Sequence, residues 1–184
     1  NILIKSKNTK VTYNKNEIIS ASYVIPEDLE ELDENAPIIL KGSFTGNRKI
    51  DEDTNIVGPS TISEFKVDKV YKGSIENDII SVLEPFEIKD NNFTNIEGYI
   101  PMEENKEYIL FLRENDISEG KQYTIKFISF GKYNTSKEDN IVNQKSSIKY
   151  LEEVKDSEFI SESQEICDTY INIKGEVLDK YLYK

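Results

Sequence analysis

The sequence predicts a mainly β fold with flanking α helices, in which five or six antiparallel strands form a small closed or partly open barrel. The first observation is the stretch 61–73, TISEFKVDKVYKG, whose apolar and charged side chains alternate with the period of a half-buried strand. The second is the recurrence of apolar runs of strand length, each separated from the next by a polar segment. Short strands spaced in this way are typical of small all-β barrels.

The composition excludes several classes of function. The 184 residues suit one domain, and the net charge of −12 repels phosphate backbones, so nucleic acid is not an expected partner. The chain has no histidine, which removes the usual general base and the commonest zinc ligand. A single cysteine allows neither an internal disulfide nor a multi-thiolate metal site. We therefore expect no catalytic residue, no cofactor and no bound metal.

The amino-terminal part divides into a polar segment and a short helix. Residues 1–16 are rich in lysine and asparagine, and we interpret them as a tether or an added edge strand, with a frayed terminus as the alternative. Because the chain begins at Asn1 rather than methionine, we expect export to a surface; a cytosolic protein with a trimmed start is the alternative. Pro26 and the acidic residues after it predict a short helix that buries Leu29 and Leu32 and solvates its acids.

Three segments in the first half of the chain form the core of the predicted barrel. Residues 36–44 are a continuous apolar run, as expected of a strand that is covered on both faces at its start. In the stretch 61–73 the apolar parity slips by one between Val67 and Val70, which predicts a β-bulge. After a turn, residues 79–83 restart a strand within reach for antiparallel pairing.

The segment 46–60 is predicted to be a polar loop. Within it, Asp51, Asp53 and Asn55 have the every-other-residue oxygen spacing that calcium loops use. The match is partial, because the glycine and the glutamate that an EF-hand loop requires are both replaced by isoleucine. We interpret the segment as an ordinary loop, with a cation site as the alternative.

The second half of the barrel is predicted from two strong strands and weaker pieces. Residues 107–113 are apolar on both faces, which indicates a central strand, and residues 122–130 alternate again. Residues 131–133 and 141–142 are the last expected strand pieces. The acid- and asparagine-rich segment 87–97 is predicted to be a loop that interrupts the sheet.

The carboxyl-terminal tail has helical rather than strand periodicity. Ser161 and Gln164 resemble a capping box, and an apolar stripe at helical spacing follows them. Residues 166–174 also alternate, so a strand followed by a shorter helix remains an alternative. Residues 147–155 predict an earlier helix. Cys167 is interpreted as a small core residue without a role, because no base is near to activate it.

Four motifs together resemble a known family. They are the apolar strand ending in glycine at 36–42, FKVDKVYKG at 65–73, KEYILFL at 106–112 and the strand ending in GKY at 131–133. Over residues 36–142 the chain is similar to a group of poorly characterised Gram-positive surface proteins, many of them predicted lipoproteins. The folds of that group are similar to the OB-type barrel of netrin-like and metalloproteinase-inhibitor domains.

The resemblance implies a location but no inhibitory mechanism. Metalloproteinase inhibitors chelate the protease zinc with an N-terminal cysteine and depend on disulfides, and this chain offers neither, so no inhibitory residue is carried over. The lipid-bearing cysteine of a lipoprotein would precede Asn1. Membership of the group would therefore place the protein at the extracellular face of the cell membrane, with membrane contact only through that anchor.

Three parts and one function are predicted. Residues 1–16 are the tether or edge segment, residues 17–145 the OB-like barrel, and residues 146–184 a helical appendage packed on it. We expect a non-catalytic binding or interaction module, displayed at the cell surface, that binds an unknown protein or surface ligand through its loops, 46–60 and 90–101 first. A carboxylate-dependent hydrolase, and a structural or assembly component of a surface complex, are the alternatives.

Overall fold

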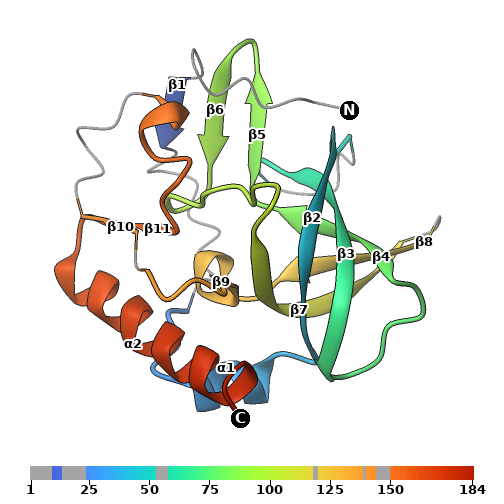
Figure 1. Cartoon of the computed structure of the whole chain (residues 1–184). Coiled ribbons are helices and arrows are strands. Elements are labelled where there is room, and N and C mark those ends of the chain that lie inside the picture. The colour runs from blue at the N-terminus through green and yellow to red at the C-terminus, as the bar shows by residue number, and fades with distance from the viewer. Residues whose placement is uncertain (1–9, 14–23, 53–57, 118–119, 139, 144–149) are drawn as a thin grey trace.

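Five strands close into a barrel at the centre of the computed structural model (Figure 1). The structure describes residues 10–13, 24–52, 58–117, 120–138, 140–143 and 150–184. Pairing between the first and the fourth barrel strand closes the barrel, which confirms the predicted fold. The barrel strands are β2 (Ile38–Ile50), β3 (Thr61–Lys72), β4 (Ile79–Glu84), β7 (Glu107–Ile117) and β8 (Gly120–Ile125).

The strand order around the barrel is β2-β3-β4-β8-β7, returning to β2. One contact departs from the predicted antiparallel arrangement, because β4 and β8 run parallel, with Ser81 opposite Gln122 and Leu83 opposite Thr124. Parallel strands need a long connection, and here the chain between them supplies it by way of β7. Only three residue pairs join β4 to β8, fewer than in any other contact of the barrel. This contact is therefore the shortest seam of the barrel wall.

The bulge predicted in β3 is present. Gly42 of β2 lies opposite Val67, but Lys41 lies opposite Lys69, so Asp68 is an extra residue on β3. A Cβ atom at Gly42 would lie 2.1 Å from the carbonyl oxygen of Lys66. Glycine is therefore required where the bulged strand approaches its neighbour most closely.

Strand β2 extends beyond its predicted end. It continues to Ile50, past a register shift between Phe44 and Arg48, so residues 46–50 of the expected loop belong to the strand; residues 53–57 lie outside the described residues. Arg48 is buried, although its charge favours a loop position. The extension follows from the buried carboxylate of Glu84, which accepts a hydrogen bond from Arg48.

Strand β7 separates two hydrophobic cores. Tyr108, Leu110 and Leu112 point into the barrel, whereas Ile109 and Phe111 point outward into a second core beneath the helices. This arrangement confirms the prediction of a central strand with two apolar faces. Strand β7 therefore connects the barrel to the helical layer.

Two helices cover the outer face of the barrel at β2 and β7 (Figure 1). Helix α1 (Leu29–Asn35) begins after the N-cap Asp28, and it buries Leu29 and Leu32 as predicted. Helix α2 (Gln164–Tyr181) has Ser163 as its N-cap, instead of the expected Ser161. Residues 166–174 are helical, so the alternative of a strand is wrong. The apolar stripe of α2 packs on the second core, and this burial outweighs the short alternation in the sequence.

A second, three-stranded sheet replaces part of the loop predicted at 87–97. Strands β5 (Phe86–Lys89) and β6 (Asn92–Asn95) form a hairpin, and β1 (Lys10–Tyr13) adds to β6 in parallel. Asp90 and Asn91 make the turn with positive φ angles of 50° and 62°. Aspartate and asparagine tolerate this region, so the pair can serve as a tight hairpin turn without glycine.

The remaining short elements correct two predictions. The strand expected over 122–130 ends at Ile125, because Phe127 and Ile128 adopt positive φ angles and lead into the 3₁₀ helix η2 (Ile128–Gly131). Of the helix expected over 147–155, the described part contains the 3₁₀ turn η4 (Leu151–Glu153); residues 144–149 lie outside the described residues. The other short strands are β9 (Lys132–Asn134), β10 (Ile141–Val142) and β11 (Phe159–Ile160).

Candidate functional site

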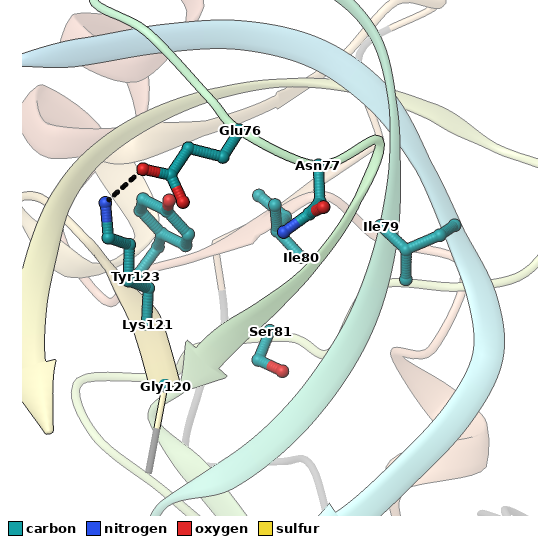
Figure 2. A pocket seen from close by; sticks show the side chains of 8 residues that line it. All are labelled: Glu76, Asn77, Ile79, Ile80, Ser81, Gly120, Lys121 and Tyr123. Carbon is teal, nitrogen blue, oxygen red and sulfur yellow. Dashed lines mark hydrogen bonds and ion pairs between the residues drawn. The ribbon is translucent and has the colours of Figure 1, made fainter. Parts of the chain in front are cut away.

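A pocket of about 360 Å³ lies at the seam between β4 and β8 (Figure 2). The two strands are paired only from Ser81 and Gln122 onward. Before this point Ile80 on β4 and Lys121 on β8 have no ladder partner across the seam, and the wall of the barrel is open between them. The connection between β3 and β4, which includes Glu76 and Asn77, lines the same opening.

An ion pair spans the mouth of this pocket. The Nζ atom of Lys121 lies 3.2 Å from a carboxylate oxygen of Glu76 and 3.4 Å from one of Glu114. The hydrogen bond with Glu76 and the negative charge of Glu114 raise the pKa of Lys121 above its ordinary value. The lysine is therefore fully protonated at neutral pH. One cation shared by two carboxylates leaves this group of three with a net negative charge.

The interior of the pocket is more apolar than its mouth. Ile80 and Tyr123 are 6% and 3% exposed and belong to the core inside the barrel. Burial and the charge of Glu114 raise the pKa of Tyr123, so its hydroxyl remains protonated and able to donate. Figure 2 shows the ring of Tyr123 beside the Glu76–Lys121 pair, with Asn77 and Ser81 adding polar groups. The pocket thus combines an apolar wall with a polar rim.

A second candidate is the buried carboxylate of Glu84 inside the barrel. One of its oxygens accepts from Arg48 at 2.9 Å and from the Ser63 hydroxyl at 2.5 Å. The other accepts from the Tyr99 hydroxyl at 2.6 Å and from the backbone N–H of Met102 at 2.8 Å. Both oxygens are therefore occupied by donors of the protein.

The electrostatics of Glu84 indicate a structural role. Burial alone would raise its pKa, but the charges of Arg48 and Lys132 and the hydrogen bonds from Ser63 and Tyr99 hold the pKa below its ordinary value. An ionised carboxylate saturated with donors neither abstracts nor delivers a proton near neutral pH. Its contacts instead attach the segment 96–102 to the barrel wall.

The second buried ion pair, Glu158–Lys174, has a comparable structural role. The Nζ atom of Lys174 lies 2.6 Å from the Glu158 carboxylate, and the other carboxylate oxygen accepts from the backbone N–H of Asn134 at 2.7 Å. Burial raises the pKa of Glu158, and Lys174 opposes that rise. The pair therefore connects α2 to β9 and β11 at the edge of the second core.

The residues singled out in the sequence do not assemble into this site. Asp51 accepts a hydrogen bond from Ser60, whereas Asp53 and Asn55 lie outside the described residues. No group of acids and cysteines in the described ranges could hold a metal ion. Cys167 is buried in the second core, where burial raises the pKa of its thiol. The lining of the seam pocket carried no signal in the sequence, because it depends on where two distant strands stop pairing.

One of the two loops expected to bind a partner is a structural segment instead. Within residues 90–101, Phe93, Tyr99 and Ile100 are almost completely buried and pack inside the barrel. Asn95 donates to the carbonyl oxygen of Tyr99 at 2.8 Å and fixes the fold of this segment. Replacing it by a glycine-serine linker would remove part of the core, so it is unsuited to variable recognition.

Comparisons of the chain with family models, with curated proteins and with solved structures returned no match. Among the described residues, no helix is both long enough and apolar enough to cross a membrane. The resemblance to Gram-positive surface proteins therefore stays a prediction.

Proposed function

We propose that the protein is a non-catalytic binding module, displayed at a cell surface, that takes its ligand at the seam between β4 and β8. The observation that supports this proposal is the open wall of the barrel at Ile80 and Lys121, where a pocket reaches the core. The volume of about 360 Å³ is within the range of small-molecule sites. A rigid barrel around the opening keeps the pocket formed before a ligand arrives.

The arrangement of the carboxylates favours binding over hydrolysis. A glycosidase-type mechanism needs two carboxyl groups that face each other across the substrate. Glu84 and Glu158 are each saturated by donors in the interior, and Glu76 and Glu114 both bind the same ammonium group of Lys121. We therefore assign the Glu76 carboxylate, which lines the pocket, a hydrogen-bonding role toward the ligand.

A pocket-blocking variant tests the binding function. Asn77→Trp places a large ring at the mouth, and Asn172→Trp makes the same change at an exposed site on α2. A chemically mixed library of compounds is screened against the three proteins by melting temperature. The proposal expects compounds that raise the melting temperature of the wild type and of Asn172→Trp but leave that of Asn77→Trp unchanged. Compounds that stabilise all three proteins equally contradict it. Mass spectrometry of each bound compound after long incubation must show no turnover.

The surface location has its own test. The native protein is partitioned between detergent and water, and the intact mass of its amino terminus is measured. A diacylglyceryl cysteine ahead of Asn1 is the expected result, since the family resemblance implies a lipid anchor. A free, unmodified terminus in the cytosolic fraction would remove the surface part of the proposal and leave the binding site to be judged by the blocked variant alone.

A further inference from the structure

The charges at the seam pocket limit what it can bind. Lys121 is already shared by Glu76 and Glu114, and the whole chain carries a net charge of −12. An anionic ligand would approach against that field and would meet two carboxylates beside the single ammonium. A cationic ligand would have to compete with Lys121 for the same carboxylates at close range. A neutral ligand avoids both costs.

The rim offers both donors and acceptors. The Glu76 carboxylate accepts and the Lys121 ammonium donates, while the Asn77 amide and the Ser81 hydroxyl can each do both. Neighbouring hydroxyl groups on a ligand both donate and accept, so they can satisfy this mixed set without carrying a charge. A ligand with one isolated polar group would leave several of these atoms unpaired on desolvation.

The inner wall offers an apolar surface of limited size. The Ile80 side chain and the Tyr123 ring line the pocket from β4 and β8, on either side of the seam (Figure 2). A pyranose ring presents hydroxyls at its edge and C–H groups on its faces. Its faces match the apolar wall, and its edge matches the polar rim. The pocket volume of about 360 Å³ suits one such ring better than a long segment of a polymer.

We infer that the seam pocket binds a neutral, polyhydroxylated ligand, specifically one neutral sugar residue of a glycan. Glu76, Asn77, Ser81 and Lys121 hydrogen-bond its hydroxyls, and Ile80 and Tyr123 pack against its C–H face. This inference depends on the proposed binding function and adds the class of ligand. Glu76 and Lys121 contact each other in the free protein, so two of the four polar groups already lie side by side before the ligand enters.

Nuclear magnetic resonance titration tests the ligand class. Methyl glucoside, methyl galactoside, methyl mannoside and N-acetylglucosamine are the neutral probes, and glucuronate and glucosamine are their anionic and cationic counterparts. We expect at least one neutral probe to shift the backbone amide signals of residues 76–81 and 120–123. Glu76→Leu and Lys121→Met, which remove the hydrogen-bonding groups, should each weaken that binding about tenfold, the effect of one lost hydrogen bond to a charged group. Lys69→Met, at an exposed lysine of β3, is the matched control and should bind as the wild type does.

Each other outcome overturns the inference in a recognisable way. Tighter binding of glucuronate or glucosamine than of every neutral probe assigns the pocket to a charged ligand, while the proposed binding function stands. Shifts outside the seam, or equal weakening by Lys69→Met, show that the sugar binds elsewhere. Absence of shifts with all neutral probes at high millimolar concentration rejects the sugar class. The comparison of Asn77→Trp with Asn172→Trp still decides the binding function separately.

Discussion

Glu84 shares its carboxylate among several donors inside the barrel. Its carboxylate neutralises Arg48 and lies close enough to Lys132 to interact with its charge, while it accepts from Tyr99 and Met102. A buried pair of this kind adds little over an apolar core of the same shape, but removing one member leaves an uncompensated buried charge. We therefore expect the cluster to specify which segment fills the barrel more than to add stability.

Replacement of Glu84 is expected to be severe. Glu84→Gln keeps the size of the side chain but leaves Arg48 without its counter-charge, so we expect the free energy of unfolding to fall by about 3–5 kcal/mol. Urea denaturation followed by circular dichroism measures the loss. Glu34→Gln, at an exposed position near the end of α1, is the matched control and should change stability by less than about 0.5 kcal/mol. Equal effects of the two variants would show that the charge cluster has no special role.

Lys132 gives the same cluster a pH dependence. Burial lowers the pKa of Lys132 to about 8, against an ordinary value of 10.5, although Glu84 and Glu158 partly oppose the change. Between these two values the unfolded chain binds more protons than the folded one, so stability rises with pH. We expect the wild type to gain up to about 1.4 kcal/mol per pH unit above pH 8, relative to Lys132→Met.

Urea unfolding of both proteins between pH 7 and 10 measures this difference. The range stops there because burial raises the pKa values of Tyr99, Tyr133 and Tyr170, and their ionisation destabilises the fold at higher pH. The variant also loses the hydrogen bond from Lys132 to the Ile100 carbonyl, which changes its stability at every pH but not the slope. Parallel curves for the two proteins would show that Lys132 does not titrate in this range.

At the scale of elements, two glycines should respond to alanine in opposite ways. Gly175 is exposed within α2, and a Cβ atom there would meet nothing within 4 Å. Gly175→Ala should therefore stabilise the protein by about 0.5–1 kcal/mol, through higher helix propensity and a less flexible unfolded chain. Gly42→Ala should destabilise it, because the new atom would lie 2.1 Å from the Lys66 carbonyl oxygen. Thermal unfolding of both variants measures the two signs, and a stabilised Gly42→Ala would contradict the bulge geometry.

The elements that the sequence predicted are those with a strong local pattern. The alternation in 61–73, the doubly apolar strand at 107–113 and the helical stripe after residue 164 all have periods that a short window reveals. The β5–β6 hairpin was missed because its turn uses Asp90 and Asn91, without the glycine that marks most tight hairpins. Polar side chains in those two strands also interrupt the apolar–polar alternation by which strands are predicted.

Other features were set by partners distant in the chain. Arg48 belongs to a strand because Glu84, 36 residues later, neutralises it inside the barrel. The seam pocket exists because β4 and β8 stop pairing before Ser81 and Gln122, which no local pattern records. The lining residues Asn77, Ser81 and Lys121 are ordinary surface types in the sequence. Only their placement around an opening makes them candidates for binding.

At the scale of the whole molecule, the two cores share the strands β2 and β7. The inner core fills the barrel, and the outer core lies between the opposite faces of β2 and β7 and the two helices. The Glu176 carboxylate on α2 accepts from the backbone N–H of Leu29, and Tyr181 donates to Asp33, so the helices are also joined to each other. The open seam between β4 and β8 lies on the side of the barrel away from the helices (Figure 1).

Removing α2 should therefore unfold more than the tail. A chain that ends at residue 162 exposes Phe111, Tyr133 and Phe159, which are at most 3% exposed in the full chain. We expect this variant to bind a hydrophobic dye and to lose the near-ultraviolet circular dichroism of its tyrosines together with cooperative melting, because packing at β7 contributes to both cores. Lys180→Ala, which removes only an exposed contact with Asp33, should melt close to the wild type. If the truncated chain still melts cooperatively, the barrel folds without α2. The helix then contributes little to the stability of the barrel. Loss of cooperativity would instead mean that the barrel and the helical layer unfold as one unit.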